Sequence, residues 1–131
     1  MRTWRFLNYR SEAGNNLIQK WYLDQDARVR ADFDITVNNL AGIADWRDTH
    51  EFKALKGKYS GLGEIRFKTG NVQYRPVGAF GPGAKTFTIL VCSRKKGQVY
   101  SPPDAFDLAL RNLSLIAQGR GSTVEHFGSV T

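Results

Sequence analysis

Hydrophobic and polar positions alternate with a helical period in the first third of the chain. Apolar residues there recur at intervals of three or four, which is the spacing of one helix face. The residues of this stripe are Val29, Phe33, Val37 and Leu40. Together with a similar pattern over 16–25, the stripe predicts two consecutive helices that bend near 24–26, and Gly42 is placed to end the second. An alternating aromatic run predicts a strand at 3–9.

Beyond residue 60 the pattern changes to that of β-strands. Three runs at 61–69, 72–80 and 86–94 are separated by glycine-containing turns. Residues 87–91 are continuously apolar except for one threonine, as expected of a central strand that is covered on both faces. Pro103 suits the first turn of a final helix. Its amphipathic stripe comprises Phe106, Ala109, Leu110, Leu113 and Ile116.

This order of elements predicts an α+β fold. A small antiparallel or mixed sheet would be packed by the N-terminal helix pair and by the C-terminal helix, because separate runs of helices and strands form such layers. We expect a single domain over 1–118 and a flexible tail over 119–131, where periodicity is lost. Residues 43–59 are expected to form a loop with a short turn of helix.

The positive charge of the chain is concentrated in its middle. The net charge is +7, and residues 53–100 contain seven lysines and three arginines but one acid, Glu64. Such a distribution favours a polyanionic partner, with nucleic acid ahead of anionic lipid. The alternative is a basic surface that only contacts solvent.

A cation-rich hairpin at 64–75 has the most unusual pattern. If its middle two residues form the turn, Lys68 faces Gln73 and Arg66 faces Arg75. Two facing guanidinium groups cost stability, and an anion between them would remove that cost. Both arginines are therefore interpreted as phosphate ligands, so that removal of Arg75 leaves the melting temperature unchanged or higher. The alternative is that one arginine pairs with Glu64 or another acid and closes the sheet.

Further cations and aromatic residues flank this hairpin in the sequence. The combination suits single-stranded nucleic acid, because bases stack on aromatic rings while phosphates pair with cations. The candidate RNA-binding residues are Lys56, Lys58, Tyr59, Lys68, Tyr74 and Arg94. The candidate catalytic residues are Arg66, Arg75, Lys95, Lys96 and Tyr100.

Other residue types restrict the chemistry. His50 and His126 are the two histidines, and they lie in a loop and in the expected tail, so a two-histidine nuclease is not expected. No cluster has metal-ligand spacing, so neither a metal nor another cofactor is expected. Cys92 is expected to be a buried reduced thiol. With a polar N-terminus and no run of about 20 apolar residues, the chain is expected to be cytoplasmic and to have no membrane partner.

The ordered set of motifs over 52–113 resembles the RelE/HigB superfamily of type II toxin–antitoxin toxins, in its phage-derived HigB-like branch. The pattern is "FKALKG", then "EIRF" and "YR" on successive strands, an apolar strand that ends in "KK", and a helix with "ALR". The resemblance implies a RelE-like microbial ribonuclease fold. It also implies a toxin that cleaves mRNA, in many members on the ribosome, with a cognate antitoxin carrying a helix-turn-helix domain as its partner.

The resemblance also assigns roles to individual residues. Arg75 takes the place of the family's phosphate-binding arginine, and Arg66 fits the preceding strand. Lys95 or Lys96 takes the place of the basic residue that follows the central strand, and Tyr100 that of a tyrosine before the last helix.

The implied reaction is metal-free endonucleolytic cleavage. The RNA's 2′-hydroxyl attacks the adjacent phosphate, cations stabilise the developing charge, and Tyr100 or a lysine accepts the proton, its pKa lowered by neighbouring cations. Two departures from the family pattern are Glu64, where some relatives carry lysine, and Pro76, which predicts a bulge or an edge strand. They motivate an alternative, a non-catalytic RelE-like protein of phage origin that binds RNA or an antitoxin. A third interpretation is a phage structural or interaction protein.

Overall fold

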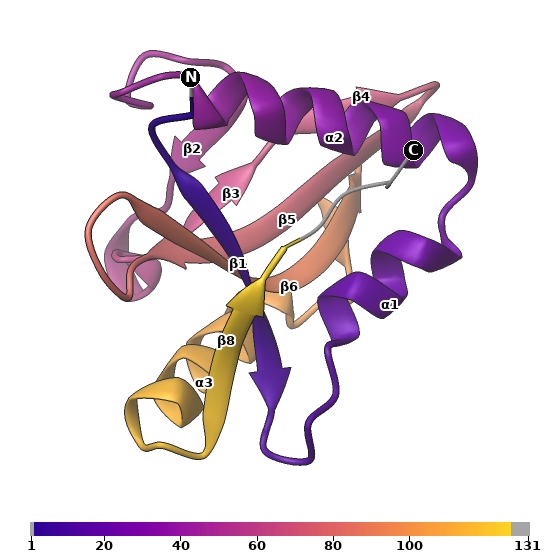
Figure 1. Cartoon of the computed structure of the whole chain (residues 1–131). Helices are drawn as coiled ribbons and strands as arrows, with labels where there is room; N and C mark the ends of the chain where they lie inside the picture. The colour runs from indigo at the N-terminus through magenta and orange to yellow at the C-terminus, as the bar shows by residue number, and fades with distance from the viewer. Residues whose placement is uncertain (1, 127–131) are drawn as a thin grey trace.

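Helices and strands form close to the positions that the two periods predict. A computed structural model describes residues 2–126 of the protein (Figure 1). The helices are α1 (Leu17–Asp24), α2 (Ala27–Ala41) and α3 (Ala105–Ala117), and a 3-10 turn, η1, spans Gly57–Tyr59. The strands are β1 (Arg5–Ser11), β2 (Phe52–Ala54), β3 (Gly63–Ile65), β4 (Phe67–Thr69), β5 (Val72–Phe80), β6 (Thr86–Lys96), β7 (Val99–Ser101) and β8 (Gly121–Glu125).

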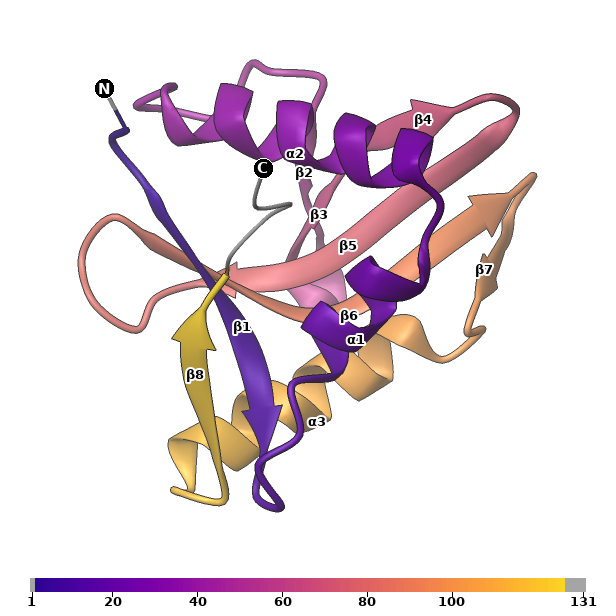
Figure 2. The same cartoon turned by 45° about the vertical axis from the view of Figure 1, so that its right-hand side comes forward.

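The strands form one open, mixed sheet. Its order is β2-β3-β5-β6-β1-β8, and β4 and β7 pair with β5 and β6 outside this path. Strands β1 and β6 are parallel, whereas the other pairs are antiparallel. Figure 2 shows β5 and β6 crossing the middle of the molecule as its two longest strands. The predicted α+β class with a mixed sheet is confirmed.

The two N-terminal helices are separated by a capping residue. Asp26 accepts the backbone N–H groups of Arg28 and Val29, which begins α2 immediately after α1 has ended at Asp24. Gly42 is the C-cap of α2. The predicted apolar stripe of this helix is buried, so the two helices, the bend and the end of α2 are confirmed.

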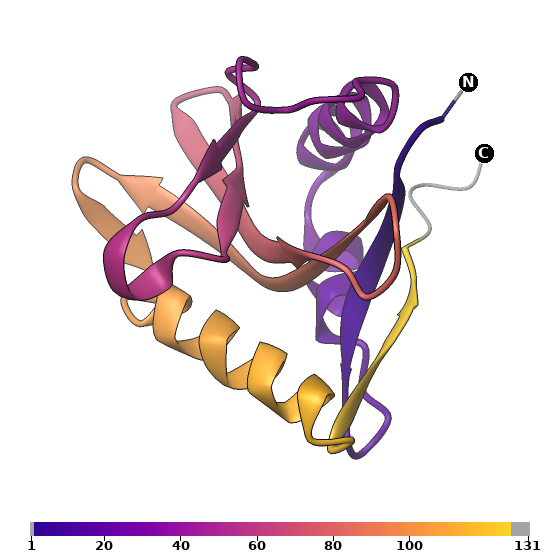
Figure 3. The ribbon, with the colours of Figure 1, turned by 90° about the vertical axis from the view of Figure 1, so that its left-hand side faces the viewer.

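Helices cover the sheet on both faces (Figure 3). On the α1–α2 face, Phe33 packs with Phe87 and Ile89 in the larger core cluster. On the α3 face, Leu90 and Ala109 belong to a second cluster. Strand β6 therefore contributes to both cores, as its apolar sequence predicted. Strand β6 is covered on both faces because either face would otherwise expose large apolar side chains to water.

The segment 43–59 contains one element that its mixed pattern did not indicate. The turn of helix is present as η1, but Phe52–Ala54 forms the edge strand β2. Phe52 is the buried residue of this strand and packs against Trp46.

Within residues 2–126, no helix is both long enough and apolar enough to traverse a membrane.

The C-terminal segment differs from the expected flexible tail. Residues 121–125 form β8, which pairs with β1 from Leu7↔Glu125 to Ser11↔Gly121, so that expectation is wrong for these residues. Residues 127–131 of the expected tail lie outside the described part of the chain. The strand escaped detection because its short sequence, GSTVE, alternates weakly and all five residues are half-buried.

Candidate functional site

The predicted hairpin forms, and the predicted register is present next to its turn but does not extend to the arginines. Residues 70 and 71 are the two-residue turn, Gly70 has a φ of +59°, and Lys68 lies opposite Gln73. The β4–β5 ladder ends at Phe67↔Tyr74. Arg66 lies in the break between β3 and β4, where its backbone N–H donates to the carbonyl oxygen of Glu51. Arg66 therefore does not pair with Arg75 in the ladder.

Pro76 lies among irregularities of the sheet. It is opposite Cys92 in the β5–β6 ladder, and the register shifts between Val77 and Gly78. On the other side of β5, partners change from β4 at Tyr74 to β3 at Val77. The bulge that the proline predicted is present nearby, and the missing N–H coincides with a region where the ladders are already interrupted.

A row of polar side chains crosses four strands at the open end of the sheet. Residues that lie directly opposite each other in a ladder share a face of the sheet. From β4 to β7 the row consists of Lys68, Gln73, Lys95 and Tyr100. Phe67 and Tyr74, which alternate with this row, belong to the core under α1 and α2. The row is therefore on the α3 face. The pair Arg75↔Ser93 is two positions further along β5 and β6, so it lies on the same face.

The structure divides the predicted basic residues between two faces. Arg94 lies opposite Tyr74, so it and Lys96 are on the α1–α2 face. Tyr74 is 6% exposed and its ring stacks on Phe67 at 5.0 Å. The prediction that Tyr74 binds RNA is wrong for base stacking, because its ring is already covered. The side chains of Lys95 and Lys96 lie on opposite faces of the sheet.

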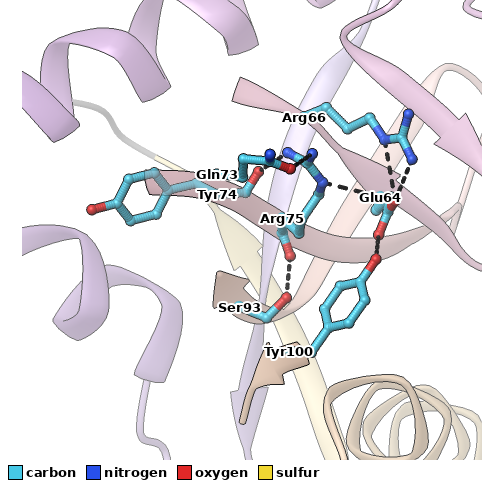
Figure 4. A network of polar contacts seen from close by, with 7 residues as sticks. All are labelled: Glu64, Arg66, Gln73, Tyr74, Arg75, Ser93 and Tyr100. Atoms are coloured by element: carbon cyan, nitrogen blue, oxygen red, sulfur yellow. Dashed lines mark hydrogen bonds and ion pairs between the residues drawn. The ribbon is translucent and has the colours of Figure 1, made fainter. Parts of the chain in front are cut away.

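Glu64 is the centre of the polar cluster on the α3 face (Figure 4). Its side chain is 1% exposed. The Arg66 Nε and Nη2 atoms donate to Oε1 at 3.1 and 3.0 Å, and the Tyr100 hydroxyl donates to Oε2 at 2.8 Å. Arg75 Nε lies 3.9 Å from Oε1. The anion between the two arginines is therefore Glu64 itself, and the alternative of a pairing with this glutamate is confirmed.

Arg75 is held inside the cluster by further contacts. Its Nη1 donates to the carbonyl oxygen of Tyr74 at 2.9 Å and its Nη2 to Gln73 Oε1 at 2.6 Å. The side chain is 11% exposed. Desolvation lowers the pKa of Arg75, and the charge of Glu64 opposes this shift. Because arginine stays protonated in proteins, Arg75 is a fixed, nearly buried positive charge. Arg66, at 32%, is the more exposed of the two arginines.

Tyr100 is a proton donor in this arrangement. Burial raises its pKa to about 12, the hydrogen bond and negative charge of Glu64 act in the same direction, and Arg75 and Arg66 act against it. The prediction that neighbouring cations lower this pKa is wrong, because the carboxylate and the burial outweigh them. Lys95 Nζ lies 5.3 Å from the centre of the Tyr100 ring, which is a cation–π contact.

The turn η1 borders the cluster through an aromatic contact. Phe106 of α3 lies between Tyr100 and Tyr59, with ring centroids 4.8 and 5.2 Å away. The Tyr59 hydroxyl donates to Asp107 at 2.8 Å, and Lys58 Nζ lies 3.3 Å from the same carboxylate oxygen. The basic residues of this loop, Lys56 and Lys58, are exposed. The predicted residues 56–59 are thus on the α3 face, beside Tyr100.

The sequence interpretation missed Glu64 as a site residue. The available signal was that it is the one acid among ten cations over 53–100. Lys53 lies directly opposite Glu64 in the β2–β3 ladder and is exposed on the same face.

Within residues 2–126, no group of three or more His, Cys, Asp or Glu side chains could hold a metal ion. Comparison of the chain with protein-family models, curated proteins and solved structures finds no match.

Proposed function

We propose that the protein is an RNA-cleaving toxin of the RelE/HigB type, with a RelE-like ribonuclease fold, that acts on mRNA in the cytoplasm. The observation that carries the proposal is the hydrogen bond from Tyr100 to the buried Glu64, in a cluster with Arg66 and Arg75. The row that contains Lys68 and Lys95 adds exposed or half-exposed cations beside this cluster. Single-stranded RNA has the negative charge and the reactive 2′-hydroxyl that suit such a surface.

The proposed proton path begins at the RNA. The 2′-oxygen attacks the adjacent phosphorus, its proton passes to the Tyr100 oxygen, and the Tyr100 proton passes to Glu64 Oε2. The O2′–P bond forms and the P–O5′ bond breaks, which leaves a 2′,3′-cyclic phosphate and a 5′-hydroxyl that takes its proton from Lys95 or water. A buried carboxylate can serve as the final proton acceptor in this path because Tyr100 connects it to the surface.

The cations have separate roles in this mechanism. Arg66, being the more exposed arginine, contacts the phosphate oxygens together with Lys68 and Lys95. Arg75 supplies a fixed positive charge beneath them, since its nitrogen atoms are directed to Tyr74, Gln73 and Glu64. Charge that is already in place when the phosphate becomes more negative stabilises the transition state without reorganisation.

The proposed partner is a cognate antitoxin with a helix-turn-helix domain. An acidic or amphipathic segment of that protein would cover the α3 face and so prevent RNA from reaching Tyr100. Hydrogen exchange of the co-expressed pair tests this part. Protection is expected over 64–75 and 94–101, and protection confined to residues 1–50 would contradict occlusion of the site.

The experiment for the main proposal is mapping of RNA ends. Controlled expression of the protein without its partner should produce new mRNA ends by primer extension, and the purified protein, with or without ribosomes, should leave 2′,3′-cyclic phosphates. A 2′-deoxy substitution at the cut position should abolish cleavage. The Tyr100→Phe variant should lose cleavage by about 10²-fold or more, whereas Arg47→Gln, which removes an exposed cation beside Trp46, should cleave normally. Absence of cleavage under all these conditions would refute the enzyme.

A non-catalytic RNA- or antitoxin-binding protein is the second candidate. The sequestration of Arg75 favours it, because a guanidinium held by Tyr74, Gln73 and Glu64 is not free to bind a phosphate. This candidate predicts binding of 2′-O-methyl RNA with no cleavage of the unmodified RNA of the same sequence. The enzyme predicts both binding and cleavage, so the pair of substrates separates the two functions.

A further inference from the structure

A groove lies on the α1–α2 face of the sheet, behind the polar row. Its cavity volume is about 440 Å³, within the range of small-ligand sites. The lining residues come from the β4–β5 turn, from the end of β6 and from β7. They are Asn71, Val72, Arg94, Lys95, Lys96, Val99 and Ser101.

The two cations on this side of the sheet are not neutralised by the protein. Arg94 and Lys96 are exposed, and neither forms an ion pair with a carboxylate among the residues that the structure describes. Asp32 of α2 accepts a hydrogen bond from Thr69 of this hairpin and forms no ion pair with either cation among the described residues. Arg94 and Lys96 are two positions apart on β6 and so lie on the same face of the strand. Neighbouring cations without an internal partner favour an anionic ligand.

The groove also has an apolar part. Val99 is 68% exposed, which is the largest exposure among the large hydrophobic residues that stand out on the described surface, and it lies opposite Lys96. Val72 lines the same cavity from β5, and the Asn71 amide at the turn can both donate and accept hydrogen bonds. The groove therefore combines an apolar surface with two cations and an amide, and these groups can contact the base and the phosphate of a nucleotide.

A nucleic acid strand can reach this groove from the proposed active site. Tyr100 and Ser101 are consecutive on β7, and their side chains lie on opposite faces of the sheet. Among the described strands, β7 pairs with β6 alone, so its outer edge is open. An RNA strand that lies over Tyr100 therefore needs to pass around only the short edge of β7 to enter the groove.

We infer that the groove is a subsite for a nucleotide that flanks the cleavage position, with its phosphate on Arg94 and Lys96 and its base on Val99. The inference rests on the proposed function and deepens it, because it makes substrate length part of recognition. It also assigns a role to the two predicted basic residues that lie away from the catalytic face. The ligand is the same single RNA strand that is cut at Tyr100.

The test is a series of RNA oligonucleotides that extend a fixed cleavage site by one to four nucleotides on either side. For the wild-type protein, kcat/KM should rise by roughly tenfold at the length that first fills the groove, as expected for one additional base contact and one phosphate paired with a cation. This increment should shrink to about twofold in Arg94→Gln and in Val99→Asp. The control Arg47→Gln, at the opposite end of β5 and β6, should retain the full increment.

Binding of 2′-O-methyl oligonucleotides of the same lengths separates this inference from the proposed enzyme. The affinity should show the same step with length, and the salt slope should fall by about 0.7 in Arg94→Gln, because one phosphate is no longer neutralised by an arginine. A step in the affinity for 2′-O-methyl RNA, together with no cleavage of the unmodified RNA, supports the subsite and refutes the nuclease. Cleavage with no step at any length, a step that Arg94→Gln and Val99→Asp leave intact, or no binding at all overturns the subsite.

Discussion

Replacement of Glu64 by glutamine is the sharpest perturbation of the cluster. The substitution keeps the size of the side chain and one acceptor oxygen, but it removes a negative charge that is 1% exposed and lies between two arginines. A charge pair at 3.9 Å, the separation of Arg75 Nε and Glu64 Oε1, is worth about 4 kcal/mol at an effective dielectric constant of about 20. The Arg66 pair is partly exposed, so its contribution is about 1 kcal/mol.

The net loss of stability is smaller than this gross energy. Water can approach Arg66, and the glutamine oxygen retains one hydrogen bond, so we expect Glu64→Gln to lose about 2–4 kcal/mol, near the range for breaking one partner of a buried ion pair. For a domain of this size the corresponding fall in melting temperature is roughly 10 °C. Arg75→Ala should also lower the melting temperature, which reverses the sign that repulsion between the two arginines predicted.

The assay is denaturant unfolding and thermal melting of Glu64→Gln beside a matched surface variant. Asp45→Asn also removes one carboxylate next to an arginine, but that pair with Arg47 is exposed, so no change of stability is expected. A double-mutant cycle of Glu64→Gln with Arg66→Gln isolates the energy of their pair. If Glu64→Gln unfolds at the same denaturant concentration as the wild-type protein, the cluster does not stabilise the fold and the reasoning above is refuted.

Three further predictions concern groups that titrate. The difference in absorbance between the wild-type protein and Tyr100→Phe should show a tyrosine that ionises near pH 12, and a midpoint near 10 would contradict the hydrogen bond to Glu64. Burial lowers the pKa of His126 to about 4, so the unfolded chain takes up a proton first and stability should fall as the pH drops from about 6.5 to 4; His126→Gln should lose less over this window in urea unfolding. Desolvation raises the pKa of the half-buried Cys92 thiol, so it should react with a disulfide reagent at pH 8 much more slowly in the folded protein than in urea, and equal rates would contradict this shift.

Local patterns determined the helices, the longer strands and one register. Three- and four-residue spacing, Asp26 as a cap and Gly42 as a stop fix α2 by interactions within a few residues. The two-residue turn at Gly70 likewise fixes Lys68 opposite Gln73, because turn length sets the register of a hairpin. Strand β8 was missed because its small and polar residues alternate weakly, and it is held by pairing with β1, more than a hundred residues earlier.

The tertiary structure alone decided which charged side chains meet. Sequence spacing placed Arg66 and Arg75 in one hairpin, but the break between β3 and β4 and the burial of Glu64 turned their expected repulsion into a shared ion pair. The pKa of Tyr100 depends in the same way on a carboxylate 36 residues away. Electrostatic energies depend on distance and solvent access, and both are set by how separate segments pack together rather than by the order of residues along the chain.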